Sequence, residues 1–420
     1  MLLKQFLVML IVVYSSATAT AVAASDPFLA NWMGQFYPLM SHLTLLDLSL
    51  PGTHDSLSYD LSTIVSEGGY DESETLSKIL HFASEIGLTP GKWIRNQGVT
   101  QRLNVTEQLN NGIRFLDFRI MYSSTFATPR DWYSLHFVQS NKKALEYFAE
   151  IRNWLEAHPT EVVVLWVSKH GNECATGNNQ FPGVPISEKR KYWASIEALF
   201  SGLLLDSVNS PLNSTSLETL LQRNQRVIIF ASDYNEFTGN SRYAMDGCKI
   251  DNKLPLSMDE EIKSYHEITK IFNNSKTILE KDKAENKFFL MSLAPTETPK
   301  YLKYAFLTKY SHFFRDENRK NCASTFNIPN MSDWCPGSLL NISHLANYYS
   351  QINLDLAVNC DLDFPNAIYI DGLDQGGTIL TGETLKSQNE TLNTRFAYVD
   401  SLLIRNVKRS CQFRPHSKCE

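Results

Sequence analysis

The run Val162-Val163-Val164-Leu165-Trp166-Val167 constrains the fold of this chain most, because it holds only aliphatic and aromatic side chains. A strand with one solvated face alternates polar and apolar residues, whereas a parallel strand covered on both faces is apolar throughout. Just upstream, apolar residues recur at helical spacing from Leu145 to Leu155, and Pro159 ends that helix. This helix and strand predict a parallel sheet covered by helices.

Similar apolar segments recur along the chain and are separated by helical stretches, one of which runs from Ser187 to about Leu204. We expect strands at Leu45–Leu50, Ile113–Ile120, Val227–Ala231, Phe288–Leu293 and Ala367–Ile370. Alternation of strand and helix favours an α/β fold. Irregular stretches at 59–77, 172–185, 233–283 and 318–336 predict long loop insertions. No Pro/Gly/Ser-rich linker divides the sequence, so we expect one elaborated domain over residues 25–420.

The first 24 residues have the composition of a secretory signal peptide. One basic residue, Lys4, precedes the apolar run Phe6–Tyr14, and small residues follow up to Ala24. The apolar run is much shorter than the roughly 20 residues that span a bilayer. We expect cleavage near Ala23 or Ala24 and a secreted or secretory-lumen protein.

The cysteines and sequons fit such a compartment. None of the seven cysteines stands in a C-x-x-C pair, so disulfides are favoured over zinc. The odd count leaves at least one thiol free or intermolecular, and two of the cysteines, Cys411 and Cys419, lie in the C-terminal tail. Six Asn-x-Ser/Thr sequons are possible glycan sites; they lie at Asn104, Asn213, Asn273, Asn330, Asn341 and Asn389.

Composition and charge exclude several classes of protein. With 43% hydrophobic and 20% charged residues, the chain can bury a sizeable core, which excludes a disordered or fibrous protein. The 39 basic and 45 acidic residues give a formal net charge of −6, and no Lys/Arg-rich block is present. A nucleic-acid partner is therefore not expected.

Three segments carry residues suited to catalysis. In the first, an apolar strand meets a Pro-Gly turn and then presents His54 and Asp55. In the second, period-two alternation puts Asp117 and Arg119 on one face of a strand, which in a parallel barrel must point into its mouth. In the third, His136 ends a short apolar run. A purely structural Asp–Arg ion pair is the alternative interpretation of the second segment, although burying such a pair is costly.

Together these residues suit phosphoryl transfer by general acid–base catalysis. One imidazole would take a proton from an attacking hydroxyl, and the other would give a proton to the leaving oxygen. The guanidinium of Arg119 would stabilise the charge that develops on the phosphate.

The segments resemble the X domain of phosphatidylinositol-specific phospholipases C. The motifs are Pro-Gly-Thr-His-Asp-Ser, Gln-Leu-x-x-Gly-Ile-Arg-x-Leu-Asp-x-Arg, Leu-His-Phe-Val and Glu-Val-Val-Val-Leu, whose order and spacing match over about residues 45–170. The resemblance implies a distorted TIM-type (β/α) barrel with long loop insertions. It also implies a phosphoric diester hydrolase that cleaves a phosphoinositide through attack of the inositol 2-hydroxyl.

The resemblance also implies roles for individual residues. His54 would be the general base, His136 the general acid and Arg119 the phosphate clamp. Asp55 would orient His136, and Asp117 would be the acidic partner of Arg119. Asp371 would support His54, with Asp374 as the competing candidate. Lys169 would be a basic residue that lines the pocket.

The cationic residue at the clamp position sets the expectation for metals. An Arg there supplies the charge that calcium supplies in the calcium-dependent relatives, so we expect no catalytic metal and no cofactor. The expected partners are a phospholipid or inositol-phosphate substrate and, transiently, a membrane surface. Residues 233–366 match nothing in the family, so two alternatives stay open. One is a non-inositol phosphodiester substrate, and the other is a catalytically weak or inactive barrel that binds lipid or glycan.

Overall fold

The structure is a computed structural model, and it describes residues 27–66, 74–85, 91–125, 128–168, 184–253, 274–294, 365–371 and 398–412. The predicted signal peptide, Lys169 and Asp374 lie outside these residues.

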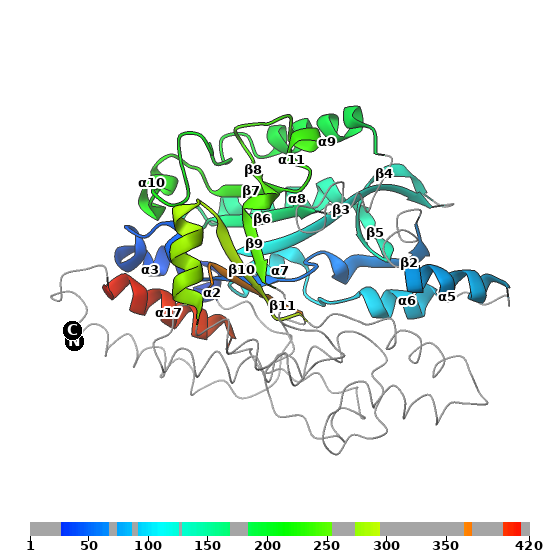
Figure 1. Ribbon diagram of the computed structural model, residues 1–420, viewed down its shortest axis with the longest axis horizontal. Helices are drawn as coiled ribbons and strands as arrows, with labels where there is room; N and C mark the ends of the chain where they lie inside the picture. Colours follow the sequence, from blue (N-terminus) through cyan, green and yellow to red (C-terminus); the bar gives the residue numbers. More distant parts are fainter. Residues whose placement is uncertain are drawn as a thin grey trace, which may run out of the picture.

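Eight parallel strands form the centre of the molecule (Figure 1). Along the sheet each strand pairs with the next one in the chain, and the last strand, β11, pairs with the first, β1. Of all neighbours in this ring, only β8 and β9 do not pair with each other among the described residues. The strands are β1 (Leu50–Thr53), β3 (Phe115–Thr125), β6 (Val163–Ser168), β7 (Val227–Ala231), β8 (Met245–Asp246), β9 (Ile250–Lys253), β10 (Phe288–Ser292) and β11 (Ala367–Ile370). This order is that of a (β/α) barrel that is distorted at one seam.

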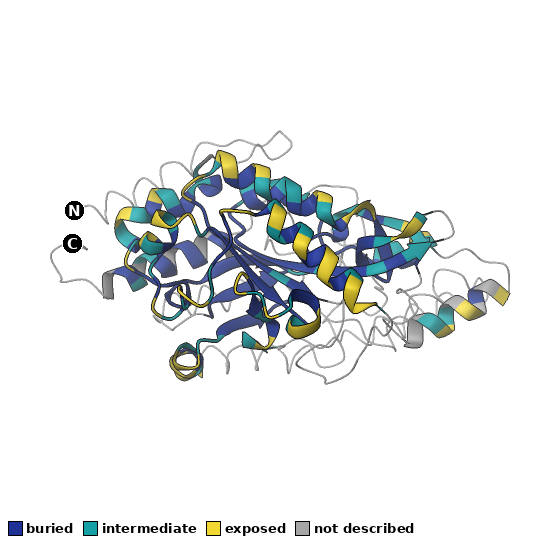
Figure 2. Ribbon diagram, turned by 90° about the horizontal axis from the view of Figure 1, so that it is seen from above, coloured by how far each residue is buried: buried dark blue, intermediate teal, exposed yellow. Residues whose placement is uncertain are grey.

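The helices cover the outside of this sheet. In Figure 2 the strands are buried, and several helices around them carry exposed outer faces. Phe118 on the outer side of β3 packs on Phe148 of α8 with ring centroids 4.9 Å apart. The helices are α2 (Pro27–Ala30), α3 (Trp32–Met40), α5 (Glu74–Glu85), α6 (Gly91–Gly98), α7 (Val105–Asn110), α8 (Ala144–Ala157), α9 (Ile186–Leu199), α10 (Leu217–Gln222), α11 (Tyr234–Thr238) and α17 (Tyr398–Gln412). Short 3-10 turns lie at Leu45–Asp47, Ser58–Asp60 and Gly247–Lys249.

Strand β3 belongs to two sheets. Its first half pairs in parallel with β1 and β6, and its second half pairs antiparallel with β4 (Thr128–His136). Strand β4 continues into β5 (Val138–Lys143), which pairs with β2 (Leu61–Val65). Because β4 runs back along β3, its last residue returns to the carboxyl end of the barrel strands. The sequence did not predict this antiparallel extension, which brings His136 to the site.

A buried arginine joins β3 to the N-terminal helices. Arg114 and Glu161 are fully buried and paired at 2.6 Å. The same guanidinium donates to the carbonyls of Leu29 and Ala30 and lies 4.8 Å from the centre of the Trp154 ring. A buried cation is tolerated when its donors are satisfied in this way. The pair therefore ties α2 to the end of the barrel opposite the carboxyl ends of the strands.

Most predicted strands are confirmed within two residues at their starts, and β7 and β11 match at both ends. The strand predicted at Leu45–Leu50 is wrong, because residues 45–47 form a 3-10 turn and the strand begins only at Leu50. The cause is local: Asp47 accepts hydrogen bonds from the backbone and the hydroxyl of Thr44, which closes a turn. The helix predicted to reach Leu204 ends at Leu199.

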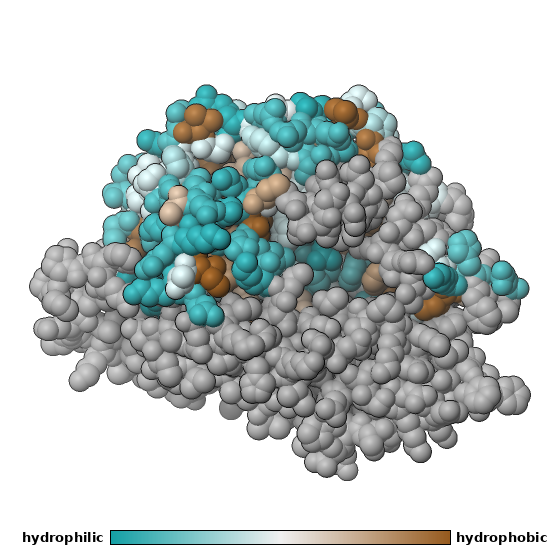
Figure 3. Space-filling view, viewed as in Figure 1, coloured by the Kyte–Doolittle hydropathy of each residue, from teal (hydrophilic) through white to brown (hydrophobic). Residues whose placement is uncertain are grey.

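None of the helices in the described part of the chain combines the length and the apolar character that a bilayer crossing needs. On the face drawn in Figure 3, the apolar side chains of the described residues are scattered rather than gathered in one patch. The large apolar residues that are exposed are likewise far apart in the sequence: Ile186, Val208 and Tyr243.

Candidate active site

Six of the seven site residues predicted from the sequence meet at the carboxyl ends of the barrel strands. His54 and Asp55 follow β1 directly, Asp371 follows β11, and Asp117 and Arg119 lie on the inner face of β3. His136 is the last residue of β4. Lys169, the seventh, lies outside the described residues. The carboxyl ends of barrel strands are where enzymes of this fold carry their chemistry.

His54 is held between an acid and a cation. Its Nδ1 lies 2.7 Å from Oδ1 of Asp371, and its Nε2 lies 2.5 Å from Nη2 of Arg119. A guanidinium can only donate, so Nε2 accepts and Nδ1 donates its proton to Asp371. Asp371, one of the two candidate partners of His54, is therefore in contact with it, whereas Asp374 lies outside the described residues. The Tyr369 ring stacks on the imidazole with centroids 5.1 Å apart.

The surrounding charges change the pKa of His54. Burial alone lowers the pKa of this imidazole, but the carboxylates of Asp55 and Asp371 more than offset that effect, so the pKa lies above its ordinary value. Burial raises the pKa of the Asp371 carboxyl, and contact with His54 opposes the rise. In the neutral form of His54 the ring proton lies on Nδ1, as its contacts with Asp371 and Arg119 require.

Arg119 lies among the other acidic groups of the site. Its Nε is 2.5 Å from Oδ1 of Asp55 and 3.0 Å from Oδ2 of Asp117. Both carboxylates are almost fully buried, whereas the arginine side chain is 16% exposed. Burial raises the pKa of Asp117, and the guanidinium only partly offsets this. Arg119 is thus a partly exposed cation placed to meet an anion that enters from solvent.

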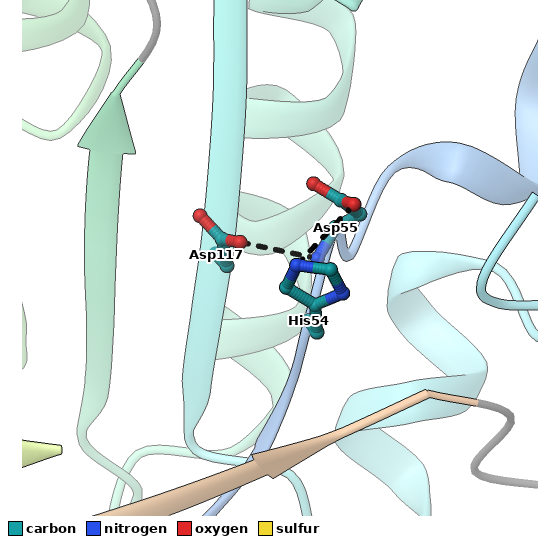
Figure 4. Close-up of side chains that lie close together, drawn as sticks. All are labelled: His54, Asp55 and Asp117. Carbon is teal, nitrogen blue, oxygen red and sulfur yellow. Dashed lines mark hydrogen bonds and ion pairs between the residues drawn. The ribbon is translucent and has the colours of Figure 1, made fainter. Parts of the chain in front are cut away.

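His54, Asp55 and Asp117 could also hold a metal ion. They face one another from the ends of β1 and β3, and one ligand atom of each lies within 4.8 Å of the others (Figure 4). In the structure, however, the guanidinium of Arg119 contacts all three of these side chains. A cation bound at this point would have to displace it. The guanidinium thus already contacts these donors and offsets part of their negative charge.

His136 has a closer partner than the one predicted. Its Nδ1 lies 2.7 Å from the carbonyl oxygen of Gly98 and 3.3 Å from Oδ2 of Asp55. Asp55 also lies 3.5 Å from Nε2 of His54, so it stands between the two imidazoles. The ring centroids of His54 and His136 are 6.5 Å apart. A tetrahedral phosphate between them could meet one ring on each side.

Several residues that the sequence did not single out support the backbone of the site. The side chain of Gln101 donates to the carbonyls of His54 and Ile370, and the Thr100 hydroxyl donates to that of His54. Ser56 donates its hydroxyl to the carbonyl of Thr53 and accepts from the backbone of Asp117. Ser56 ends the Pro-Gly-Thr-His-Asp-Ser motif but was given no role, whereas Thr100 and Gln101 have no ionisable group and lie in none of the quoted motifs.

The backbone itself is constrained next to each histidine. Asp55 has a φ of 43° and Phe137 a φ of 63°, and non-glycine residues rarely occupy this left-handed region. Such positions persist only where surrounding contacts hold them, and they concentrate at functional sites. Asp55 directly follows His54, and Phe137 directly follows His136.

Part of the chain matches a known protein family. Residues 94–251 match the family model described as PI-PLC X 1. The matched segment belongs to the PI-PLC X family. It contains Asp117, Arg119 and His136, whereas His54, Asp55 and Asp371 lie outside it.

Named relatives of the PI-PLC X family cover about half of the chain. PI-PLC X domain-containing protein 1 of Mus musculus is 31% identical over 227 residues, which are 53% of this chain and 58% of the relative. Its namesake of Homo sapiens is 31% identical over 205 residues, which are 48% and 57% of the two chains. The match thus spans less than two thirds of either relative.

Solved bacterial structures resemble the chain over a longer stretch but at low identity. A variant of the phosphatidylinositol-specific phospholipase C from Staphylococcus aureus covers 92% of this chain with a TM-score of 0.49 and 13% identity. The corresponding enzyme from Listeria monocytogenes covers 90% with a TM-score of 0.46. The strand order described above already identifies the barrel.

Proposed function

We propose that this chain is a phosphodiesterase of the PI-PLC type that cleaves a phosphoinositide, or a related phosphodiester, with His54 and His136 as base and acid. The observation that carries the proposal is the pair of contacts of His54. Asp371 accepts a hydrogen bond from Nδ1–H, so in the neutral ring the lone pair lies on Nε2, beside the guanidinium of Arg119. A base and an anion clamp at one point are what attack on a phosphate requires.

The proposed first step forms one bond and breaks another at phosphorus. The anionic phosphate accepts the hydrogen bond from Nη2 of Arg119. Nε2 of His54 is then free to accept the proton of a hydroxyl that neighbours the phosphate. That hydroxyl oxygen bonds to phosphorus, and the bond from phosphorus to the diacylglycerol oxygen breaks. His136, in its charged form, gives the Nε2 proton to the departing oxygen. The products are a cyclic inositol phosphate and diacylglycerol, and no redox partner is needed.

Phosphatidylinositol hydrolysis in the presence of a chelator tests this proposal. Vesicles of phosphatidylinositol would be incubated with the purified chain and EDTA, and phosphorus NMR would follow the cyclic phosphate. Appearance of the cyclic product that depends on His54 supports the proposal. A chain that binds the vesicles but gives no product would favour the non-catalytic lipid- or glycan-binding alternative. Turnover only with a non-inositol diester would favour the alternative of a phosphodiesterase with a non-inositol substrate.

The proposal includes a secreted or secretory-lumen location and transient contact with a membrane surface. The N-terminal 24 residues support it by their composition, and Cys248 is disulfide-bonded in the structure. Disulfides persist in oxidising compartments. The substrate would be reached peripherally, without an anchor in the described part of the chain.

The pH dependence of the reaction is expected to report the raised pKa of His54. A base acts in its neutral form, so a raised pKa moves the onset of activity to higher pH. The acidic limb of kcat/KM should therefore lie above the ordinary imidazole value of about 6.5. The measurement uses a short-chain phosphatidylinositol below its micellar concentration, so that no charged interface disturbs the local pH.

The Asp371→Asn variant provides the comparison for this profile. It removes one of the two carboxylates that raise the pKa of His54, so its acidic limb should move to lower pH. A wild-type limb at or below pH 6.5, or a limb that stays in place in Asp371→Asn, would contradict the assignment of His54 as the base.

A further inference from the structure

We infer that Gly98 is a positioning residue for the acid His136, and that the position requires glycine. The inference rests on the proposed function, since it concerns how the acid is held. Gly98 is buried and is the last residue of α6. Its carbonyl oxygen lies 2.7 Å from Nδ1 of His136, while the carboxylate of Asp55 is 3.3 Å away. The backbone carbonyl is thus the nearer partner of the imidazole.

A carbonyl partner fixes which nitrogen of His136 carries the transferable proton. A carbonyl oxygen only accepts, so Nδ1 of His136 keeps its hydrogen in both charge states of the ring. The proton that the acid gives away is therefore the one on Nε2. A carboxylate alone would leave this tautomer less strictly defined, because it can itself take up a proton.

The close approach of α6 explains why this residue has no side chain. A Cβ placed on Gly98 would lie 2.6 Å from the carbonyl oxygen of His136 and 3.2 Å from Cδ1 of Leu61. The first distance is too short for any real contact, so even alanine would push α6 away from the end of β4. The hydrogen bond from Nδ1 would then lengthen or break.

Phe137 supports the same imidazole from its ring face. The two rings are stacked with centroids 4.5 Å apart and planes 21° from parallel. Phe137 is the single residue between β4 and β5, and it holds this place with a φ of 63°. A bulky residue in the left-handed region costs free energy, which the fold tolerates here. The ring and the Gly98 carbonyl together restrict His136 in two directions.

The segment 98–101 also contacts the base. Thr100 and Gln101, two and three residues after Gly98, both donate to the carbonyl of His54. One four-residue segment therefore holds the acid by a carbonyl at its start and the base by side chains at its end. Movement of Gly98 changes the placement of the acid relative to the base.

The leaving group of the substrate separates a positioning role from a structural one. The alkoxide of diacylglycerol leaves poorly and needs a proton from the acid. A 4-nitrophenolate leaves unaided, so the 4-nitrophenyl diester of inositol phosphate needs the base and the clamp but hardly the acid. A change that only misplaces His136 should slow the first substrate far more than the second.

Gly98→Ala is expected to lower kcat on phosphatidylinositol by about 10- to 100-fold and kcat on the 4-nitrophenyl diester by less than about threefold. His136→Ala gives the upper limit of this selectivity. The matched control is Gly91→Ala at the other end of α6, where a Cβ would lie 1.9 Å from the carbonyl oxygen of Thr63. This control disturbs the packing of the same helix without contact to His136, so it should change both rates by the same factor.

Equal losses on the two substrates in Gly98→Ala, or no loss on either, would overturn the inference. If Gly98→Ala does not fold, the tautomer of His136 in the wild type decides the question, because a carbonyl partner requires Nδ1 to be protonated. Nitrogen NMR of the neutral ring should show the hydrogen on Nδ1, and a hydrogen on Nε2 would overturn the inference. Failure of the wild type on both substrates would instead refute the proposed function.

Discussion

Replacing His54 with alanine is expected to lower kcat/KM for phosphatidylinositol by about 10³- to 10⁴-fold, while the chain stays folded. The imidazole contacts both Asp371 and Arg119, which fixes its tautomer and places its Nε2 lone pair beside the phosphate clamp. The effect is measured from initial rates, with the thermal unfolding midpoint recorded for each variant.

His158→Ala is the control for the loss of an imidazole. His158 follows α8, donates from Nδ1 to the carbonyl of Trp154 and stacks on the ring of the same residue, away from the site. This variant should keep wild-type turnover. Added imidazole should restore part of the activity of His54→Ala, because it can enter the space left by the removed side chain and act as the base beside Arg119. Turnover of His54→Ala within threefold of wild type would show that another group is the base.

The part of the site that sequence could predict lies within single strands. Side chains alternate strictly along a strand, so the pattern at 115–120 is enough to place Asp117 and Arg119 on one face and Phe118 on the other. The structure has this arrangement, with Phe118 packed on α8. The turn after β1 is equally local, and it presents His54 and Asp55 as the motif indicates.

The pairing of His54 with Asp371 could not be settled from sequence. The two residues are 317 positions apart and meet only because β11 pairs with β1 when the barrel closes. Two carboxylates near that strand end, Asp371 and Asp374, have the same chemistry. Only the register of the pair β1 and β11 decides which of them reaches the imidazole.

The second partner of His136 was missed for a different reason. The family resemblance implied Asp55, whose Oδ2 does lie 3.3 Å from Nδ1, but it gave no sign of the nearer carbonyl of Gly98. Gly98 acts through its backbone carbonyl, which every residue has, so nothing in the residue type marks it. The antiparallel extension that carries His136 was also missed, since β4 and β5 contain polar residues and lack the long apolar runs of the barrel strands.

Arg119→Lys is the second change for which a large loss is expected, of about 10²- to 10³-fold in kcat. The guanidinium contacts Asp55, Asp117 and His54 at the same time through a planar set of donors. An ammonium is a point charge that cannot reproduce this geometry, although it keeps the positive charge. Loss of turnover with the charge retained would show that the directions of the donors matter.

Arg119→Ala separates this effect from the stability of the site. Without the cation, the buried carboxylates of Asp55 and Asp117 lose their compensating charge, and breaking such a pair costs about 3–5 kcal/mol. Arg119→Lys should therefore stay near wild type in its unfolding free energy, whereas Arg119→Ala should lose much of it at neutral pH and regain part at acid pH. The control is Arg130→Lys on the exposed part of β4, with no expected change. If Arg119→Lys turns over phosphatidylinositol within threefold of wild type, the phosphate is held elsewhere, and Arg119 serves only to neutralise the two aspartates.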